Sequence, residues 1–139
     1  MRKIIIAFVL LVFSSGCATV SLTKFAADNQ KKVSGLEVGM NKDEVLKIAG
    51  TAQVRSGPYD FYTTVKNPYL TEILKGPAKT VEVVYYFTQW SSSGVWEKRQ
   101  ITKNELTPLI FEDNRLVAKD WDALREMTYE YQLKEGPAQ

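Results

Sequence analysis

Side chains that commonly carry out enzyme chemistry are scarce in this sequence. The 139 residues include no histidine and only one cysteine, Cys17. Metal sites and base catalysis therefore lose the residue that serves them most often. Serines occur at 91–93, but no Gly-x-Ser-x-Gly elbow surrounds them. Glu105, Glu112 and Asp113 fit solvated hairpin charges better than the paired carboxylates of a glycosidase. The sequence predicts no enzyme activity, no cofactor and no metal site.

Cys17 is the one reactive residue whose surroundings indicate a specific chemistry. A basic start at residues 1–3 precedes an apolar run at 4–13 and the small residues 14–16. This order is typical of a secretory signal peptide. A cysteine at the cleavage point is typical of bacterial lipoprotein signals, in which the thiol takes a diacylglycerol and the chain is cut before the cysteine. We therefore expect a signal peptide at 1–16 and a lipid anchor at Cys17.

Two other interpretations of this segment stay open. A transmembrane helix needs about 20 apolar residues, roughly twice the length of this run. A secreted protein with an unmodified Cys17 would carry a similar signal, and Ser14 stands where lipoprotein signals usually have leucine. Ala18 follows the cysteine, whereas lipoproteins retained at the inner membrane have aspartate there. The resemblance implies the outer membrane and its periplasmic face, through an address that a receptor reads.

The composition is that of one ordinary domain. Removing 1–16 leaves 123 of the 139 residues, about one domain's length. Lys+Arg then falls from 18 to 16 and equals Asp+Glu at 16, so the mature side chains are formally neutral. Without clustered Lys and Arg, nucleic acid is not an expected partner. We expect a lipid-anchored tether at 17–33, which runs into a weakly patterned helix, and a single domain at 34–135.

Residues 41–50 carry the clearest helix signals in the sequence. Asn41 is a favourable N-cap, and Glu44 follows at the spacing of a capping box. Val45 and Ile48 share one face at helical spacing. Gly50 fits the left-handed residue that commonly ends a helix. A helix this short needs a sheet to pack against.

The strongest strand pattern covers residues 80–90, which are rich in β-branched and aromatic residues. Because this run is apolar on both faces, we expect it at the centre of a sheet. Residues 106–111 and 115–119 predict a hairpin, since Asp-Asn at 113–114 tolerates the positive φ of a two-residue turn. Pro108 cannot donate a ladder hydrogen bond, which favours an edge or a bulge.

The remaining segments complete an α+β pattern. Residues 59–65 have the aromatic and β-branched content of a strand. Residues 69–75 are interpreted as one helical turn. Asp120 is a suitable cap for a last helix over 121–134, which Gly136-Pro137 would end.

The helix at 41–50 also carries a family resemblance. Its motif resembles the small outer-membrane lipoproteins of the BamE (SmpA/OmlA) type, although Ala52 stands where that family has proline. The resemblance implies N-terminal helices packed on a three- to four-stranded antiparallel sheet, here followed by a C-terminal helix. It also implies a binding or scaffolding role in outer-membrane protein assembly. Segments 66–79, 91–104 and 121–134 exceed the compact BamE pattern and favour an uncharacterised relative. The matching residues are Gly39, Met40, Asn41, Val45 and Gly50.

Aromatic residues are the candidates for partner binding, because tyrosine and tryptophan dominate interface energetics. Trp90 ends the apolar strand, and Trp96 lies near Lys98 and Arg99 in a segment with little core pattern. An indole beside two cations suits a protein partner or lipid headgroups. The alternative is that these indoles pack back against the sheet.

The sequence thus predicts a lipid-anchored periplasmic binding or scaffolding lipoprotein of the cell envelope. It would support outer-membrane protein assembly or envelope integrity, with the membrane and an envelope protein as partners. Two alternatives stay open. An enzyme inhibitor would present the segment 91–104 as a protruding loop. A small-ligand or lipid-binding module would have an apolar pocket between helix and sheet.

Overall fold

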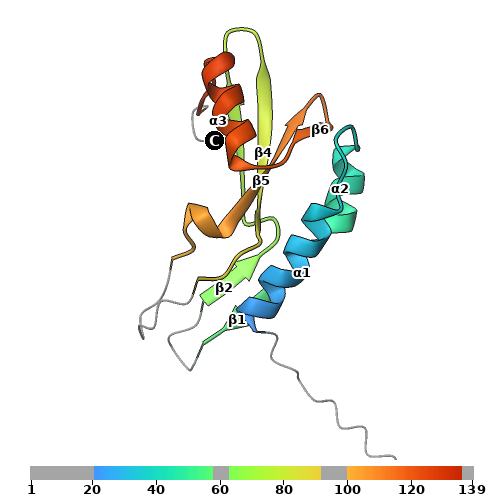
Figure 1. Cartoon of the computed structure of the whole chain (residues 1–139), viewed down its shortest axis with the longest axis vertical. Helices are drawn as coiled ribbons and strands as arrows, with labels where there is room; N and C mark the ends of the chain where they lie inside the picture. The colour runs from blue at the N-terminus through green and yellow to red at the C-terminus, as the bar shows by residue number, and fades with distance from the viewer. Residues whose placement is uncertain (1–20, 58–62, 92–99, 136–139) are drawn as a thin grey trace, which may run out of the picture.

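β4 (Thr80–Phe87) is the middle strand of a five-stranded antiparallel sheet with the order β6-β5-β4-β3-β7 (Figure 1). The computed structural model describes residues 21–57, 63–91 and 100–135. Six of the eight β4 residues are buried. Burial on both faces explains why this strand has a nearly continuous apolar sequence. The central position predicted for it is confirmed.

The other elements surround this strand. The sheet also contains β3 (Leu70–Lys75), β5 (Leu106–Glu112), β6 (Arg115–Ala118) and β7 (Lys134–Glu135). A separate two-stranded sheet pairs β1 (Gln53–Ser56) with β2 (Thr63–Lys66). The helices are α1 (Leu22–Ser34), α2 (Lys42–Ala49) and α3 (Trp121–Glu130), and a 3-10 turn, η1 (Lys103–Glu105), leads into β5. The α+β class is confirmed.

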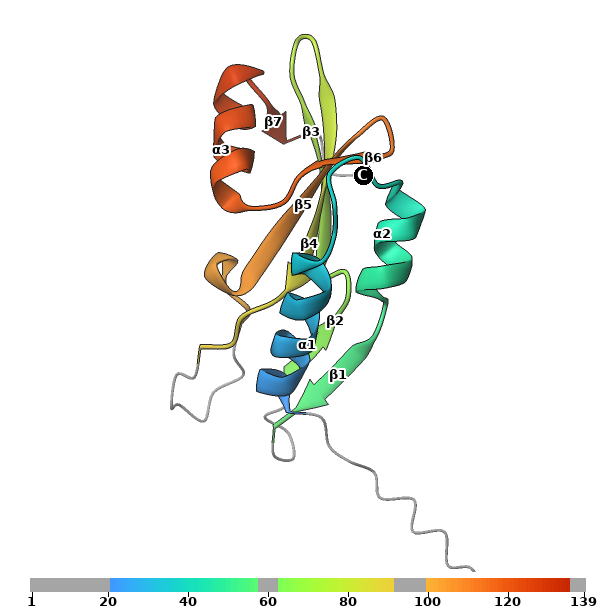
Figure 2. The same ribbon diagram turned by 45° about the vertical axis from the view of Figure 1, so that its right-hand side comes forward.

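Helices pack on both faces of the sheet, as Figure 2 shows for α2 and α3. Alternating residues of β4 divide between two apolar clusters, because successive side chains of a strand point to opposite faces. One cluster joins β4 to Leu124 of α3, and the other joins it to Val45 of α2. The β4 members are Val81, Val83, Tyr85 and Phe87 on the α3 face, and Val84 and Tyr86 on the α2 face.

α1 belongs to the folded domain rather than to a tether. Leu22 and Phe25 in its first turns lie in the α3-face cluster, and Val33 near its end lies in the α2-face cluster. The predicted tether at 17–33 is therefore wrong over most of its length. The buried positions 22, 25, 26, 29 and 33 follow helical spacing, but the stripe is hard to recognise in the sequence because Ala26 is small and Asn29 is polar. The folded domain begins near residue 21, not at 34.

α2 has the boundaries that the sequence predicted. The side chain of Asn41 accepts a hydrogen bond from the Asp43 backbone N–H at 3.0 Å and caps the helix. Gly50 ends it with a φ of 84°, a conformation that favours glycine. Its ψ of 170° carries the chain onward in an extended direction instead of the usual left-handed cap.

The sheet is larger than predicted, with five strands instead of three or four. Residues 70–75 form β3 and not a helical turn, because they pair with β4 across a tight hairpin. β1 was not predicted at all. Both errors have the same cause, since strand propensity depends strongly on the partner strand. β2 overlaps the strand predicted at 59–65, of which residues 59–62 fall outside the described part of the chain.

The structure of the C-terminal half agrees better with the elements predicted from the sequence. Asp113 and Asn114 have φ values of 46° and 65° and form the predicted hairpin turn between β5 and β6. Pro108 faces β4 at a point that β6 does not reach, so its missing N–H costs no ladder bond. The last helix is shorter than 121–134, because Gln132 has a φ of 51° and β7 then pairs with β3.

Candidate functional site

The first turn of α1, the β1–β2 pair, the end of β4 and the start of β5 meet at one end of the domain (Figure 1). We term this region the anchor end, because α1 begins here and the preceding residues lead back to Cys17. Ser21 caps α1 by accepting a hydrogen bond from the Lys24 backbone N–H at 3.2 Å. The ring of Phe25 stacks on that of Phe87 with centroids 6.3 Å apart. The start of α1 is thus fixed to the core.

Two buried amides hold the interior of the anchor end together. Asn67 Nδ2 donates to Asn29 Oδ1 at 2.8 Å, and Asn29 Nδ2 donates to the Phe87 carbonyl at 2.7 Å. The Asn67 backbone N–H also donates to the Ala52 carbonyl. These bonds connect α1, the β1–β2 pair and β4 through two residues. A buried amide is costly without partners, so the pair specifies how the three elements meet.

Glu105 is the most buried carboxylate of the described residues, with 1% of its surface exposed. Its Oε1 accepts hydrogen bonds from the backbone N–H and hydroxyl of Ser91, at 3.1 and 3.2 Å. Its Oε2 accepts from the backbone N–H and hydroxyl of Thr102, at 3.0 and 3.1 Å. One side chain therefore joins the two ends of the segment between β4 and η1.

The expectation that three carboxylates are solvated hairpin charges is wrong for Glu105. Glu112 forms an ion pair with Lys79 at 3.0 Å, and Asp113 is exposed in the hairpin turn. The sequence alone does not show which of the three carboxylates is buried. The burial of Glu105 depends on hydrogen bonds from residues such as Ser91, which is 14 residues away in the sequence. The one local signal was Thr102 three residues before Glu105, the spacing of a capping box.

The predicted partner-binding residues have different outcomes. Trp90 is partly buried, and its ring meets that of Phe87 edge-on at 6.3 Å. It packs against the core as the alternative interpretation proposed, and a role in binding stays a prediction. Cys17, Trp96, Lys98 and Arg99 lie outside the described residues.

Two neighbouring tyrosines of β4 use their hydroxyls inside the fold. Tyr85 Oη donates to Glu72 Oε2 at 2.9 Å, and burial, followed by this hydrogen bond, raises the pKa of Tyr85. Tyr86 Oη donates to the Gly50 carbonyl at 3.1 Å, and burial raises the pKa of Tyr86 to about 12. Both phenols stay neutral at physiological pH and serve as hydrogen-bond donors. Tyr85 and the neighbouring Phe87 are both buried, as expected for a strand that is apolar on both faces.

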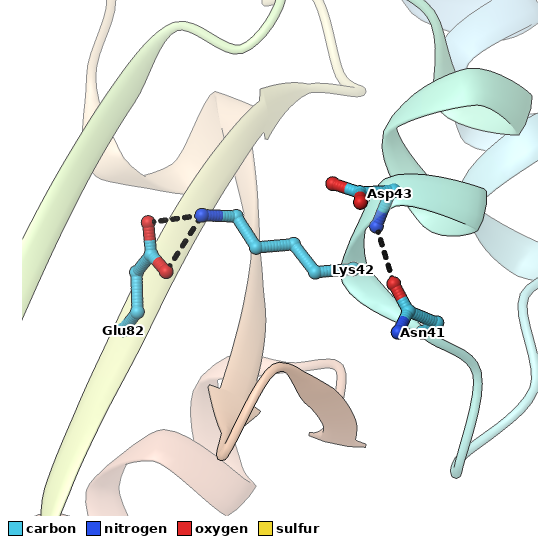
Figure 3. A network of polar contacts seen from close by, with 4 residues as sticks. All are labelled: Asn41, Lys42, Asp43 and Glu82. Carbon is cyan, nitrogen blue, oxygen red and sulfur yellow. Dashed lines mark hydrogen bonds and ion pairs between the residues drawn. The ribbon is translucent and has the colours of Figure 1, made fainter.

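An ion pair ties the start of α2 to the sheet (Figure 3). Lys42 Nζ lies 2.6 and 2.7 Å from the two carboxylate oxygens of Glu82 in β4. Figure 3 shows the lysine side chain reaching across from the helix while Asn41 caps it from below. Lys42 thus ties α2 to β4, whereas the preceding residues 39–41 cap α2 and pair with β6. The Gly39 backbone N–H donates to the Leu116 carbonyl, and the Leu116 N–H donates to the Met40 carbonyl.

An open groove of about 940 Å³ runs along α3, which we term the α3 groove. Tyr129 at its rim is 89% exposed. A smaller groove of about 490 Å³ lies between α1 and α2. The α3 groove lies on the surface of one helix, which differs from the enclosed helix–sheet pocket of a small-ligand module. Its lining residues are Trp121, Leu124, Arg125, Thr128, Tyr129, Glu130 and Gln132.

Within residues 21–57, 63–91 and 100–135, no three acidic, histidine or cysteine side chains gather closely enough to hold a metal ion. No helix in this part of the chain is both long and apolar enough to cross a membrane.

The sequence matches the model of one protein family. Residues 6–126 match the sequence model of a family described as a protein of unknown function, DUF3192. The chain belongs to this family. The DUF3192 match starts inside the predicted signal segment and ends within α3. Neither the curated proteins nor the solved structures contain a significant match to the chain.

Proposed function

We propose that this DUF3192 protein is a lipid-anchored periplasmic binding or scaffolding lipoprotein of the cell envelope. Cys17 would attach it to the outer membrane. The observation that carries this proposal is the short link between anchor and fold. Leu22, which starts α1 and is buried, lies five residues after Cys17. An extended chain spans about 3.5 Å per residue, so a lipid at Cys17 would hold the anchor end within about 17 Å of the membrane.

The charges of the anchor end suit that position. Its exposed basic residues come from α1, β1, β2 and η1, whereas the described carboxylates of these elements are Asp28 and the buried Glu105. A net positive surface is attracted to anionic headgroups by about 1 kcal/mol for each Lys or Arg close to the membrane. The exposed basic residues are Lys24, Arg55, Lys66 and Lys103.

The assembly role rests on the resemblance to BamE-type lipoproteins in the 39–50 motif. Two helices ahead of an antiparallel sheet are compatible with that resemblance. A scaffold at the membrane surface would present its far side to envelope proteins. Support for outer-membrane protein assembly, or for envelope integrity, is the activity that we propose for it.

Cys17→Ser in the full chain tests the anchor. We expect loss of palmitate labelling and release of the protein from the outer-membrane fraction. Ser14→Leu is the matched control, since it restores the usual lipoprotein signal next to an intact cysteine, and it should keep both properties. Unchanged palmitate labelling of the Cys17→Ser protein would refute the proposed lipid anchor.

A second candidate is favoured by the hydrogen bonds of Glu105. They close the base of the segment 91–104, as an inhibitor that presents a loop to a periplasmic enzyme would need. Trp96→Ala tests whether this segment binds a partner or lipid. We expect weaker crosslinking to envelope partners and weaker binding to vesicles that contain anionic lipid, relative to Ile73→Ala, which shortens an exposed apolar side chain of β3. Retention of every crosslink and of vesicle binding would reject a role for Trp96.

A further inference from the structure

The two outer edges of the five-stranded sheet differ in how far they are covered. Residues 39–42 lie along the β6 edge and form two backbone hydrogen bonds with Leu116. At the opposite edge, β7 lies beside β3 and pairs with Leu74 and Lys75 (Figure 2). No other strand in the described part of the chain pairs with this side of β3. The outer edge of β3 is therefore open over residues 70–73.

The backbone groups that face this open edge follow from the strand register. Neighbouring residues of an antiparallel strand direct their N–H and C=O groups to alternate sides. The Gly76 N–H donates to the Lys79 carbonyl at 2.7 Å in the hairpin between β3 and β4, so the even-numbered residues of β3 face β4. Thr71, Ile73 and Lys75 therefore face outward, and Lys75 is the one that β7 reaches. Thr71 and Ile73 present the open hydrogen-bonding groups.

Apolar side chains accompany these groups. Leu70 and Ile73 are 45% and 46% exposed, although both lie in a strand of the main sheet. An open strand edge is a template for pairing with another extended segment, and exposed apolar residues beside it strengthen that tendency. Natural sheets commonly protect such an edge by covering it or by placing proline on it. The sequence that follows β7 offers both forms of protection.

We propose that residues 136–139 continue β7 along the outer edge of β3 and close it as a strap. These four residues lie outside the described part of the chain, and they directly follow Glu135, which pairs with Leu74. The same register places Gly136 opposite Ile73 and Ala138 opposite Thr71. Both residues of the strap would then exchange backbone hydrogen bonds with the outward-facing groups of β3.

The position of Pro137 supports this register. Pro137 falls opposite Glu72, where the backbone groups of the strap point away from β3. Proline has no N–H, so it is tolerated on an edge strand where this group would face solvent. No bond to β3 is lost, and the new outer edge lacks a donor that another strand would need. A register shifted by one residue would turn Pro137 toward β3 and remove a bond.

Covalent attachment favours the strap over other occupants of the edge. β7 already holds Glu135 beside Leu74, so the following residues have a high effective concentration at the edge. A second copy or a strand of another protein would have to compete with it. The strap goes beyond the proposed function and does not depend on a lipid at Cys17. If copies of the protein are concentrated on a membrane by that lipid, the strap would prevent their edge-to-edge pairing.

Hydrogen–deuterium exchange measured by NMR on the full chain tests the strap. We expect the Thr71 and Ile73 amides to exchange at least about tenfold faster in a protein that ends at Glu135 than in the full chain. The Leu116 amide, which donates to the Met40 carbonyl at the opposite edge, is the control and should exchange equally in both proteins. Equal exchange of Thr71 and Ile73 in the two proteins would overturn the proposal.

Two proline substitutions test the register. Ala138→Pro removes an N–H that would face Thr71, and we expect the Thr71 amide to exchange about fivefold faster, as for the loss of about 1 kcal/mol. Gln139→Pro is the matched control, because its N–H would point away from β3, and it should leave the exchange unchanged. Thr71 exchange that is the same in the two variants would refute the register.

Concentration distinguishes the strap from a second copy. Exchange at Thr71 and Ile73 in the full chain should not change when the protein is diluted tenfold. Slow exchange that requires high protein concentration and persists in the protein ending at Glu135 would reject the strap in favour of a second copy. The Cys17→Ser protein should show the same exchange as wild type. A failed lipid anchor would therefore leave the strap standing, and a failed strap would leave the anchor standing.

Discussion

The anchor end and the α3 groove use their polar side chains in opposite ways. At the anchor end, Asn29, Asn67 and Glu105 are buried, and each joins segments far apart in the sequence. Along α3, the acidic residues and Tyr129 are exposed, and Arg125 reaches only Asp122 in the preceding turn. The anchor end uses its polar groups within the fold. Along α3 the polar groups lie mostly in solvent.

This difference shows where the fold depends on its polar residues. Buried polar groups cost free energy unless they are satisfied, so residues at the anchor end are constrained by the fold. Exposed side chains on a helix have no such constraint. Substitutions at the anchor end should therefore lower stability, and those of exposed residues on α3 should leave it nearly unchanged.

Among substitutions at the anchor end, removal of the buried Glu105 carboxylate should have the largest effect on stability. Glu105→Leu leaves the backbone N–H groups of Ser91 and Thr102 without their acceptor. We expect the free energy of unfolding to fall by about 3 kcal/mol, measured by urea denaturation. Glu112→Leu, at the end of β5, is the control, because it breaks a partly exposed ion pair and should cost about 1 kcal/mol or less. Equal losses would mean that the hydrogen bonds of Glu105 stabilise the fold no more than the partly exposed ion pair of Glu112 does.

The buried amide pair gives the next largest effect. Asn29→Ala and Asn67→Ala should each lower the free energy of unfolding by about 2 kcal/mol, because each leaves a buried amide without its partner. The double variant should lose clearly less than the sum of the two, since both remove one interaction. A double-mutant cycle by urea denaturation measures the difference. Additive losses would show that the two amides act independently.

Local signals accounted for the elements whose caps and turns lie within a few residues. Asn41 and Gly50 bound α2, and the Asp113–Asn114 turn joins β5 to β6, as the sequence predicted. Such features follow from short-range chemistry that a single sequence displays. Fixed spacing explains why these predictions were accurate.

The remaining features depend on residues distant in sequence. The sequence of β3 alone suggests a helical turn, and its pairing with β4 makes it a strand. Asn29 is one polar residue of a weakly patterned helix in the sequence, but in the fold it donates to the Phe87 carbonyl. Glu105 is buried where Ser91, 14 residues earlier in the chain, and Thr102 both donate hydrogen bonds to its carboxylate. Of the predicted site residues, Trp90 alone lies in the described part of the chain, where it packs against Phe87. No local pattern carries these long-range contacts.

The pH dependence of stability above pH 9 tests whether the Tyr86 hydroxyl is buried. The folded pKa of Tyr86 is about 12, above the usual value of 10.0. The neutral phenol therefore stabilises the folded state fully below pH 10, and this contribution is lost as pH rises toward 12. Between pH 9 and 11 we expect wild type to lose about 1 kcal/mol more than Tyr86→Phe in urea denaturation. Parallel losses in both proteins would contradict this.

Substitutions on α3 should have the smallest effect on stability, and this makes them the sharpest test of the comparison. Arg125→Ala and Tyr129→Ala remove exposed side chains and should change the free energy of unfolding by less than about 0.5 kcal/mol. Lys42→Met is the control, because its ion pair with Glu82 is partly buried and joins α2 to β4 at about 1 kcal/mol. If Tyr129→Ala destabilised the protein more than Lys42→Met in urea denaturation, the exposed residues of the α3 groove would stabilise the fold as those of the anchor end do.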